Sequence, residues 1–317
     1  MGTTAEPDLF DGFSEQVLRS DRGPIFARVG GTGPPLLLLH GYPQTHVMWH
    51  GAAARLADHC TVVAADLPGY GSSFRPVPAA DHVPHSKRAL ATDLVQAMSQ
   101  LGHERFAVAG HDRGGRVAYR MALDHPDRVT AAAVIDVVPT GEVWSRADAR
   151  MALGYWHWGF LATPAPLPER LIAADPDAFF DYHVRSLGLG SVPDRYPAEL
   201  MTLYRNLLDD SSTVQAICED YRAGASVDRE HDDADLGRRK IECPLLALWS
   251  AGGALPRWYG DVLEVWRPWA DQVSGHGIPA SHFLVEEQPE MVADALVSLV
   301  RQPGSASRGQ PTTTRRV

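Results

Sequence analysis

The sequence is short of basic charge. Its 317 residues include 29 Lys and Arg against 39 Asp and Glu, which gives a formal net charge of −10. Nucleic acids and anionic membranes bind proteins through basic surfaces, so we expect neither as a partner. An anionic substrate would need a local cluster of arginines.

Cysteine is scarce, and long apolar runs are missing. Cys60, Cys218 and Cys243 lie far apart and form no Cys-x-x-Cys pair, which favours a reducing compartment over a disulfide framework. No run approaches the ~20 apolar residues of a membrane span, and the first residues lack the pattern of a secretion signal. We therefore expect a cytoplasmic protein.

Signatures of metal and phosphate binding are also absent. The sequence contains no HExxH and no GxxxxGK motif. Its 14 histidines form no evident metal set, and His46 with His50 lacks a carboxylate partner. We expect no metal and no cofactor.

Short apolar runs alternate with helical patterns from about residue 23 onward. The expected strands are 36–39, 61–65, 106–109, 131–135 and 243–249. Continuous apolar strands suit a parallel sheet that is covered on both faces. The helical spacing of apolar residues in 86–101 predicts a crossover helix. The fold class is therefore α/β, with a mostly parallel, doubly wound sheet.

The pattern changes between the fourth and fifth of these strands. Residues 141–240 are helical, rich in aromatic residues and free of strand-like runs, so we expect a helical cap inserted into the sheet domain. The acidic run 230–235 is expected to be a solvated edge of this cap. The expected organisation is an N-terminal segment 1–20, a core formed by 21–140 and 241–302, the cap, and a disordered tail 303–317.

A strand, a sharp turn and a helix are expected across residues 106–126. The turn reads Gly110-His111-Asp112-Arg113-Gly114, the Gly-x-nucleophile-x-Gly elbow of α/β-hydrolases with Asp as the nucleophile. Glycines are needed on both sides because Cβ atoms there would clash with the backbone of the turn. The alternative is that Asp112 only caps the following helix.

Later positions supply partners for this elbow. His282 lies where such folds carry the catalytic base, and Asp136 directly after the strand 131–135 can orient it. Asp261 is the alternative acid, because no carboxylate directly follows the strand 243–249. The backbone N–H groups of Tyr42, after the strand 36–39, and of Arg113 can face a developing oxyanion.

A carboxylate nucleophile restricts the chemistry. It is ionised at neutral pH and can attack an sp³ carbon without activation, which yields an ester. Water activated by His282 would then hydrolyse that ester. Arg113 and Arg116 lie three residues apart, on one face of the elbow helix, where guanidinium groups can hold a substrate carboxylate. The alternative is that both arginines face solvent.

Five segments together resemble the haloacetate dehalogenases, a group within the α/β-hydrolase superfamily, and the resemblance covers about residues 20–300. They are HGYPQTHVMWH (40–50), GHDRGGR (110–116), YWHWG (155–159), CEDYRAG (218–224) and SHFLVEE (281–287). The resemblance implies that Asp112, Asp136 and His282 form the catalytic triad and that Arg113 and Arg116 bind the carboxylate of a small haloacid.

The resemblance also assigns the halogen site, to His157, Trp158 and Tyr221. An imidazole N–H, an indole N–H and a phenol O–H are neutral donors that can stabilise a leaving halide. Such enzymes are commonly homodimers, so we expect a homodimer that hydrolyses a haloacetate, fluoroacetate in particular, to glycolate and halide.

The sequence departs from the family pattern at three positions. Tyr42 stands where Phe is common, Ser281 precedes the base where Gly is usual, and Val285 replaces a common Pro. We expect the departures at Ser281 and Val285 to affect the rate of the reaction and not its type.

Two alternatives stay open. An epoxide hydrolase would use Asp112 with Tyr155 or Tyr221 to protonate the alkoxide, although such enzymes usually carry Trp where Arg113 stands. A binding protein could keep the fold without catalysis.

Overall fold

The structure is a computed structural model that describes residues 9–188 and 196–301. Its centre is an eight-stranded sheet with the order β1-β2-β4-β3-β5-β6-β7-β8. The strands are β1 (Ser14–Arg19), β2 (Pro24–Gly30), β3 (Pro35–Leu39), β4 (Thr61–Ala65), β5 (Phe106–His111), β6 (Val129–Ile135), β7 (Leu245–Ser250) and β8 (Val273–Ile278). Only β1 with β2 and β2 with β4 pair antiparallel. The mostly parallel sheet expected from the apolar runs is confirmed.

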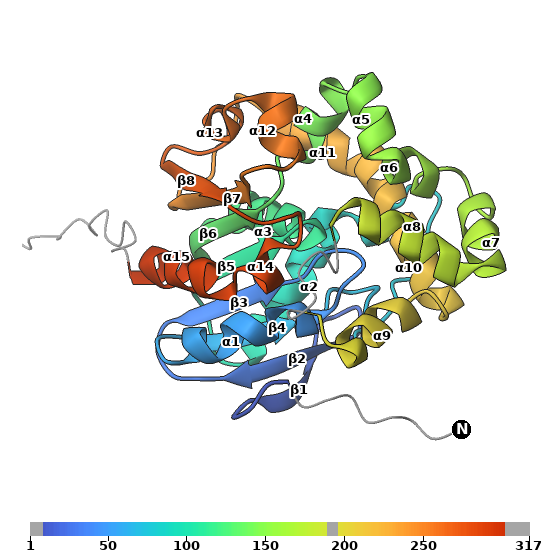
Figure 1. The fold of residues 1–317 in the computed structure, drawn as a ribbon. Coiled ribbons are helices and arrows are strands. Elements are labelled where there is room, and N and C mark those ends of the chain that lie inside the picture. Colours follow the sequence, from blue (N-terminus) through green and yellow to red (C-terminus); the bar gives the residue numbers. More distant parts are fainter. Residues whose placement is uncertain (1–8, 189–195, 302–317) are drawn as a thin grey trace, which may run out of the picture.

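Helices cover both faces of the sheet (Figure 1). On one face α1 (His50–Ala57) packs against α15 (Pro289–Arg301), and on the other α2 (Lys87–Gln100) packs against α3 (Arg113–Asp124). The crossover helix expected over 86–101 is α2. Its first turn is capped by Ser86, whose hydroxyl accepts from the Ala89 N–H.

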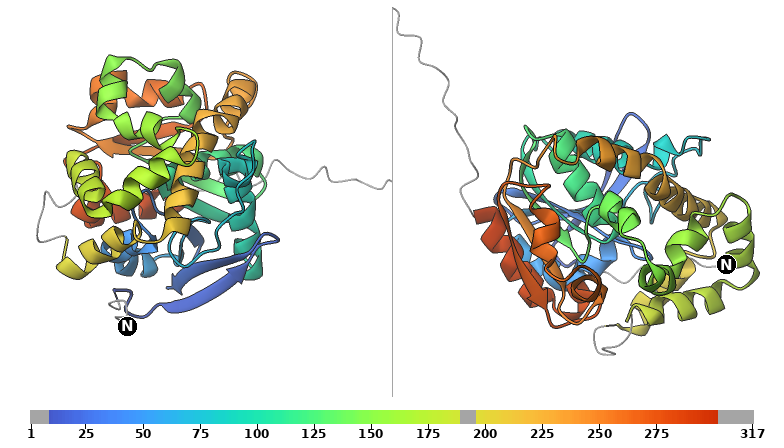
Figure 2. Two further views of the ribbon diagram at one scale, coloured as in Figure 1. Left: turned by 90° about the vertical axis from the view of Figure 1, so that its right-hand side faces the viewer. Right: turned by 90° about the horizontal axis from the view of Figure 1, so that it is seen from above.

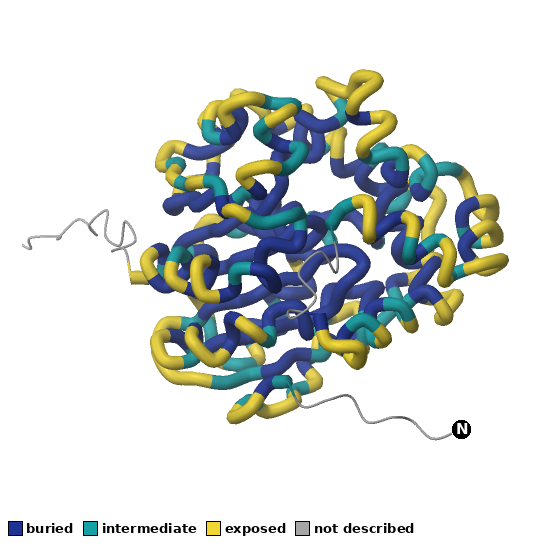
Figure 3. The backbone as a smooth tube through the Cα atoms, viewed as in Figure 1, coloured by how far each residue is buried: buried dark blue, intermediate teal, exposed yellow. Residues whose placement is uncertain are grey.

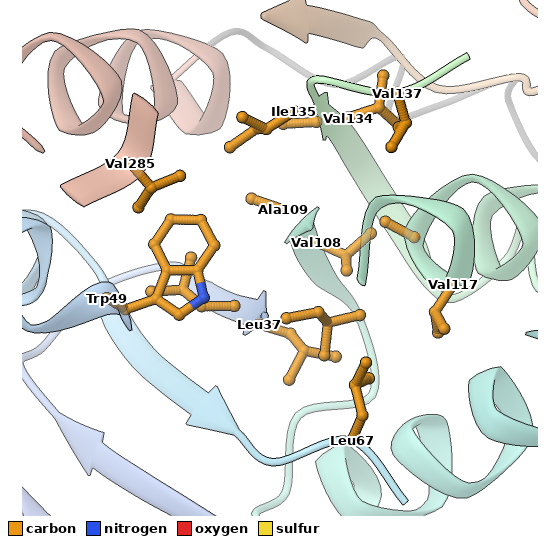
Figure 4. Close-up of a cluster of buried hydrophobic side chains, with 14 of the residues drawn as sticks. Leu37, Trp49, Leu67, Val108, Ala109, Val117, Val134, Ile135, Val137 and Val285 are labelled. Carbon is orange, nitrogen blue, oxygen red and sulfur yellow. The ribbon is translucent and has the colours of Figure 1, made fainter. Parts of the chain in front are cut away.

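Apolar side chains fill the space between sheet and helices. Figure 3 shows that the central strands are buried almost throughout, while exposed positions gather on the outer helices. Figure 4 shows Leu37, Val108 and Ile135 of neighbouring strands with Trp49 and Val285 in one cluster. Val285, one of the departures from the family pattern, is fully buried there.

The segment between β6 and β7 lies beside the sheet domain and is helical where it is described (Figure 2). Its helices are α4 (Thr140–Ser145), α5 (Ala149–Gly154), α6 (Trp156–Leu161), α7 (Leu167–Ala174), α8 (Pro176–Ser186), α9 (Ala198–Asn206), α10 (Ser211–Ala225) and α11 (Val227–Asp235). The remaining elements are η1 (His46–Trp49), η2 (Val83–His85), α12 (Ala254–Tyr259), α13 (Val262–Trp266) and α14 (Leu284–Glu287). The expected tail 303–317 lies outside the described residues.

The expectation of a solvated acidic edge at 230–235 is wrong for two of its residues. Asp232 and Asp235 are buried and pair with Arg120 of α3, Asp232 at 2.7 Å from Arg120 Nη2. Tyr119 Oη also donates to Asp232, at 2.8 Å. Partners more than 100 residues away satisfy the buried charges, and spacing within the run cannot reveal them.

Within residues 9–188 and 196–301, no helix is long and apolar enough to cross a membrane. The same residues contain no group of three or more His, Cys, Asp or Glu side chains that could hold a metal ion. The pair His46 and Asp66 is a buried hydrogen bond of 2.8 Å rather than part of a metal site.

Candidate active site

The expected catalytic residues meet at one edge of the sheet. Asp112 and Asp136 directly follow β5 and β6, and His282 follows β8. Parallel strands end at the same edge, so their carboxyl ends bring together residues that are far apart in sequence. Tyr42, in the loop after β3, joins them there.

The elbow has the strained geometry expected of a nucleophile turn. Asp112 has φ = 44°, an uncommon conformation for a residue with a side chain. A Cβ on Gly110 would lie 2.2 Å from the Gly114 oxygen, and one on Gly114 would lie 2.5 Å from the Leu39 oxygen. Neither position therefore accommodates a larger residue without a shift of the backbone.

The Asp112 carboxyl does not cap the helix that follows it. No capping hydrogen bond from its side chain to α3 is formed. Its Oδ2 instead accepts from the Tyr42 N–H at 3.2 Å, the backbone donor that was expected to face an oxyanion. The geometry therefore favours a functional carboxyl over the capping alternative.

His282 and Asp136 form a short hydrogen bond. His282 Nδ1 lies 2.6 Å from Asp136 Oδ2, and Asp136 Oδ1 accepts from the Ser250 N–H at 2.9 Å. Asp136 is itself held at φ = 51°. Asp261, the alternative acid, is exposed and caps α13 by accepting from Leu263 N at 2.8 Å. The structure thus brings Asp136, and not Asp261, to the base.

Neighbouring charges oppose the effect of burial on both reacting groups. Burial disfavours the charged form of His282, but its hydrogen bond to Asp136 and the charges of Asp136 and Asp112 outweigh burial and raise its pKa. Burial likewise disfavours the Asp112 carboxylate, but His282 and Arg113 outweigh it and lower the pKa of Asp112. The Asp112 carboxyl is therefore ionised at neutral pH.

Both expected carboxylate-binding arginines are buried rather than solvent-facing. Arg116 lines the cavity at Asp112, and its Nη1 donates to Val138 O at 2.9 Å and to Thr140 Oγ1 at 3.2 Å. Its Nε has no hydrogen-bond partner in the described part of the chain. Arg116 therefore offers a donor that a bound carboxylate can use.

Arg113 is arranged differently. Its Nε and Nη2 donate to Oδ2 and the backbone oxygen of Asp220, at 2.6 and 2.8 Å, and its guanidinium carbon lies 4.2 Å from the ring centroid of Tyr221. It is not among the residues that line the cavity around Asp112. Nη1 is its one group without a partner among the described residues.

Asp220 is a site residue that sequence reasoning missed. Besides Arg113 it binds Lys87, by a very short contact, and accepts from Tyr70 Oη at 3.2 Å. Burial alone would raise the pKa of Asp220, but the charges of Arg113 and Lys87 outweigh it and lower that pKa. The available signal was its place in CEDYRAG, directly before Tyr221.

The helical segment between β6 and β7 supplies the three residues that were expected to bind the halogen. His157, Trp158 and Tyr221 line this small cavity together with Tyr155, Leu187 and Asp112. Burial and the neighbouring His183 ring lower the pKa of His157 well below its usual value, so the imidazole is neutral. Neutral donors opposite a carboxylate nucleophile suit a departing anion.

A larger cavity adjoins this one and reaches toward solvent. It has a volume of about 470 Å³ and shares Asp136, Tyr155, Leu187 and His282 with the inner cavity. Arg185 and Arg257 also line it. A small anion can therefore approach the nucleophile past basic side chains despite the negative charge of the whole chain.

Comparisons with known proteins show which proteins the chain is similar to. Residues 34–251 match the model of the α/β hydrolase fold family. The chain is 42% identical to fluoroacetate dehalogenase from Burkholderia sp. over 288 residues, which cover 91% of this chain and 94% of that enzyme. It is 30% identical to a soluble epoxide hydrolase from Corynebacterium sp. (strain C12), with 83% and 89% of the two chains covered.

A solved structure shows the same similarity in three dimensions. A protein from Nostoc sp. PCC 7120, provisionally described as an α/β hydrolase, matches with a TM-score of 0.88 at 43% identity, over 92% of this chain and 99% of that one. The structural match and the family match therefore both indicate the α/β hydrolase fold.

Proposed function

Because the chain belongs to the α/β-hydrolase fold family and, within it, to the haloacetate dehalogenases, we propose that it hydrolyses fluoroacetate or a related haloacetate to glycolate and halide through an ester on Asp112. The observation that carries the proposal is one small cavity lined by the Asp112 carboxyl, the Arg116 guanidinium and the His157 imidazole. They supply the three groups that the first step requires: a nucleophile, a cation that binds the substrate carboxylate, and a hydrogen-bond donor to the departing halide.

In the first step Asp112 attacks the carbon that bears the halogen. A bond forms between a carboxylate oxygen and that carbon, and the carbon–halogen bond breaks with its electron pair on the halide. Arg116, which lines the cavity, holds the substrate carboxylate. His157, Trp158 and Tyr221 stabilise the charge that develops on the halide.

In the second step water attacks the Asp112 carbonyl carbon. His282 accepts a proton from the water, and the N–H of Tyr42 holds the oxyanion. The acyl–oxygen bond then breaks and glycolate leaves with the proton from His282. Asp112 keeps the other proton of the water as a carboxylic acid and releases it to solvent, which restores the carboxylate. Asp136 orients the imidazole and stabilises its charged form.

The direct test is halide release from fluoroacetate and from chloroacetate. We expect one halide and one glycolate per substrate consumed. Absence of halide release from both substrates would overturn the proposal.

Epoxide hydrolysis is the second candidate, favoured by the relative from Corynebacterium and by Tyr155 and Tyr221 at the cavity. The same nucleophile would open the ring, and a tyrosine would protonate the alkoxide. Turnover of styrene oxide without any haloacetate activity would support this candidate. The buried Arg116 argues for the anionic substrate instead.

Replacing Arg116 should weaken recognition of the carboxylate more than the chemistry. A charge-assisted hydrogen bond contributes roughly 1.5–3 kcal/mol, so we expect Arg116→Met to lower kcat/KM for chloroacetate about 10–100-fold. The rate with chloroacetamide, which has no charge, should change little. Equal losses with both substrates would show that Arg116 acts on the chemistry or the fold and not on the carboxylate.

As the pH falls, ester hydrolysis should stop while halide release continues. The pKa of Asp112 is lowered, so it stays ionised and halide release continues, whereas protonation of His282 removes the base for the second step. Because the ester of Asp112 carries no charge, the pKa of His282 is lower in the intermediate than in the free enzyme. Activity should therefore be lost on the acid side, with ester accumulating.

Rapid mixing with chloroacetate over a pH series, followed by mass analysis of the quenched enzyme, measures this. Asp136→Asn, which removes a group that raises the pKa of His282, should move the acid limb of ester hydrolysis to lower pH. If the acid limb of the pH profile lies at the same pH in Asp136→Asn and in wild type, the assignment of His282 as the base is contradicted.

We also propose a compartment and an oligomeric state for the protein. The cysteines are all free and buried, which supports a reducing compartment such as the cytoplasm. The family resemblance supports a homodimer, which light scattering on the purified protein tests.

A further inference from the structure

The base His282 sits on a loop, residues 279–282, that several elements hold in place. Ser250 Oγ donates to Ala280 O at 2.5 Å, and His111 Nε2 lies 2.8 Å from His282 O. The His111 and His282 rings are also in contact, with centroids 4.7 Å apart. The loop is therefore bonded to Ser250 at the end of β7 and to His111 at the end of β5, directly before Asp112.

A further contact to this loop uses both oxygens of one buried carboxyl group. Glu287 Oε2 accepts from the Ser281 N–H at 2.7 Å, and Glu287 Oε1 accepts from Ser281 Oγ at 2.6 Å. Glu287 ends α14 and is 4% exposed. Two hydrogen bonds to one residue restrict both its position and its rotation, and a carboxyl group that is shielded from water forms them strongly.

The hydroxyl of Ser281 extends this contact past the base. Phe283 N donates to Ser281 Oγ at 3.2 Å, so the residues on either side of His282 are hydrogen-bonded to each other. A glycine at position 281 has no hydroxyl to form either bond. The departure of this sequence at Ser281 therefore has a defined structural partner in Glu287.

We propose that Glu287, acting through Ser281, is a positioning residue for the catalytic base His282, an inference that rests on the proposed two-step function. Glu287 is not among the residues that line the cavity at Asp112, so we expect the attack on the substrate carbon to be unchanged without it. It affects the step in which His282 must align a water molecule with the Asp112 carbonyl carbon. Small displacements of a base slow such a step strongly.

The test measures the two steps separately in Glu287→Gln and Ser281→Ala. Chloroacetate is mixed rapidly with enzyme, and quenched samples are analysed for halide and for the ester on Asp112. We expect the rate of halide release in the first turnover to stay within about twofold of wild type, while ester hydrolysis slows about tenfold or more in Glu287→Gln. The double variant should lose no more than Glu287→Gln alone, because the two residues act as one unit.

Asp93→Asn is the matched control. It removes the charge of another buried carboxyl, which binds Arg22 at 3.0 Å and contacts none of the loop residues. It should lower the melting temperature and leave the ratio of the two rates unchanged.

Equal slowing of both steps in the Glu287 and Ser281 variants, or unchanged rates, would overturn the inference. Ser281→Ala keeps the backbone bond to Glu287, so it tests the inference even where Glu287→Gln does not fold. If wild-type enzyme forms no ester and releases no halide, the proposed function fails and the inference fails with it.

Discussion

Asp112→Asn should release no measurable halide from fluoroacetate or chloroacetate, a loss of at least about ten-thousand-fold. The amide is nearly isosteric with the carboxyl group and can still accept from the Tyr42 N–H, so the elbow keeps its shape. It carries no charge, however, and an amide oxygen is too weak a nucleophile to displace halide. Halide release over a series of substrate concentrations measures the effect.

Asp261→Asn provides the control for this experiment. The substitution makes the same chemical change at an exposed helix cap outside the cavity, so halide release should match wild type. Binding should survive in Asp112→Asn, since Arg116 is unchanged; protection of the melting temperature by glycolate would show this. Retained halide release in Asp112→Asn would mean that another group attacks the substrate.

The parallel strands β3 to β7 could be predicted because they are almost entirely buried and are therefore apolar. β3, β4, β5 and β6 lie where the apolar runs stand. β8 has no such signal because it contains two glycines, and Gly275 sits where a Cβ would lie 1.8 Å from the Ala247 oxygen. Glycine usually weakens a strand, but it is required at position 275 because β7 approaches too closely to leave room for a Cβ.

The members of the site that have sequence motifs were predictable, and those that support them were not. Asp112 stands in the elbow, and Asp136 follows a recognisable strand. Lys87 and Asp220, by contrast, are 133 residues apart and meet only in the folded chain. Buried ion pairs of this kind depend on tertiary packing, which leaves no periodic signal in the sequence.

The two arginines of the elbow helix also show that sequence spacing does not reveal the partners of a buried side chain. Spacing places Arg113 and Arg116 on one helix face, and both are buried there. The structure nevertheless gives them different partners, because Asp220 takes two donors of Arg113 while Arg116 faces the cavity. Recognition of the substrate carboxylate should therefore depend more on Arg116 than a symmetric clamp would suggest.

His282→Gln should trap the ester that wild-type enzyme turns over. A glutamine amide can still donate to Asp136, so the loop is disturbed little, but it cannot accept a proton from water. The first step needs no base, because Asp112 is already ionised. One halide should therefore be released per enzyme molecule, after which turnover stops.

Mass analysis of this variant after chloroacetate treatment should find one carboxymethyl group, located on the peptide that contains Asp112. The double variant Asp112→Asn/His282→Gln should gain no mass, which separates the ester from alkylation of the buried cysteines. A trapped ester excludes a binding protein without catalysis, because such a protein would release no halide at all. Continued turnover in His282→Gln would contradict the assignment of His282 as the base.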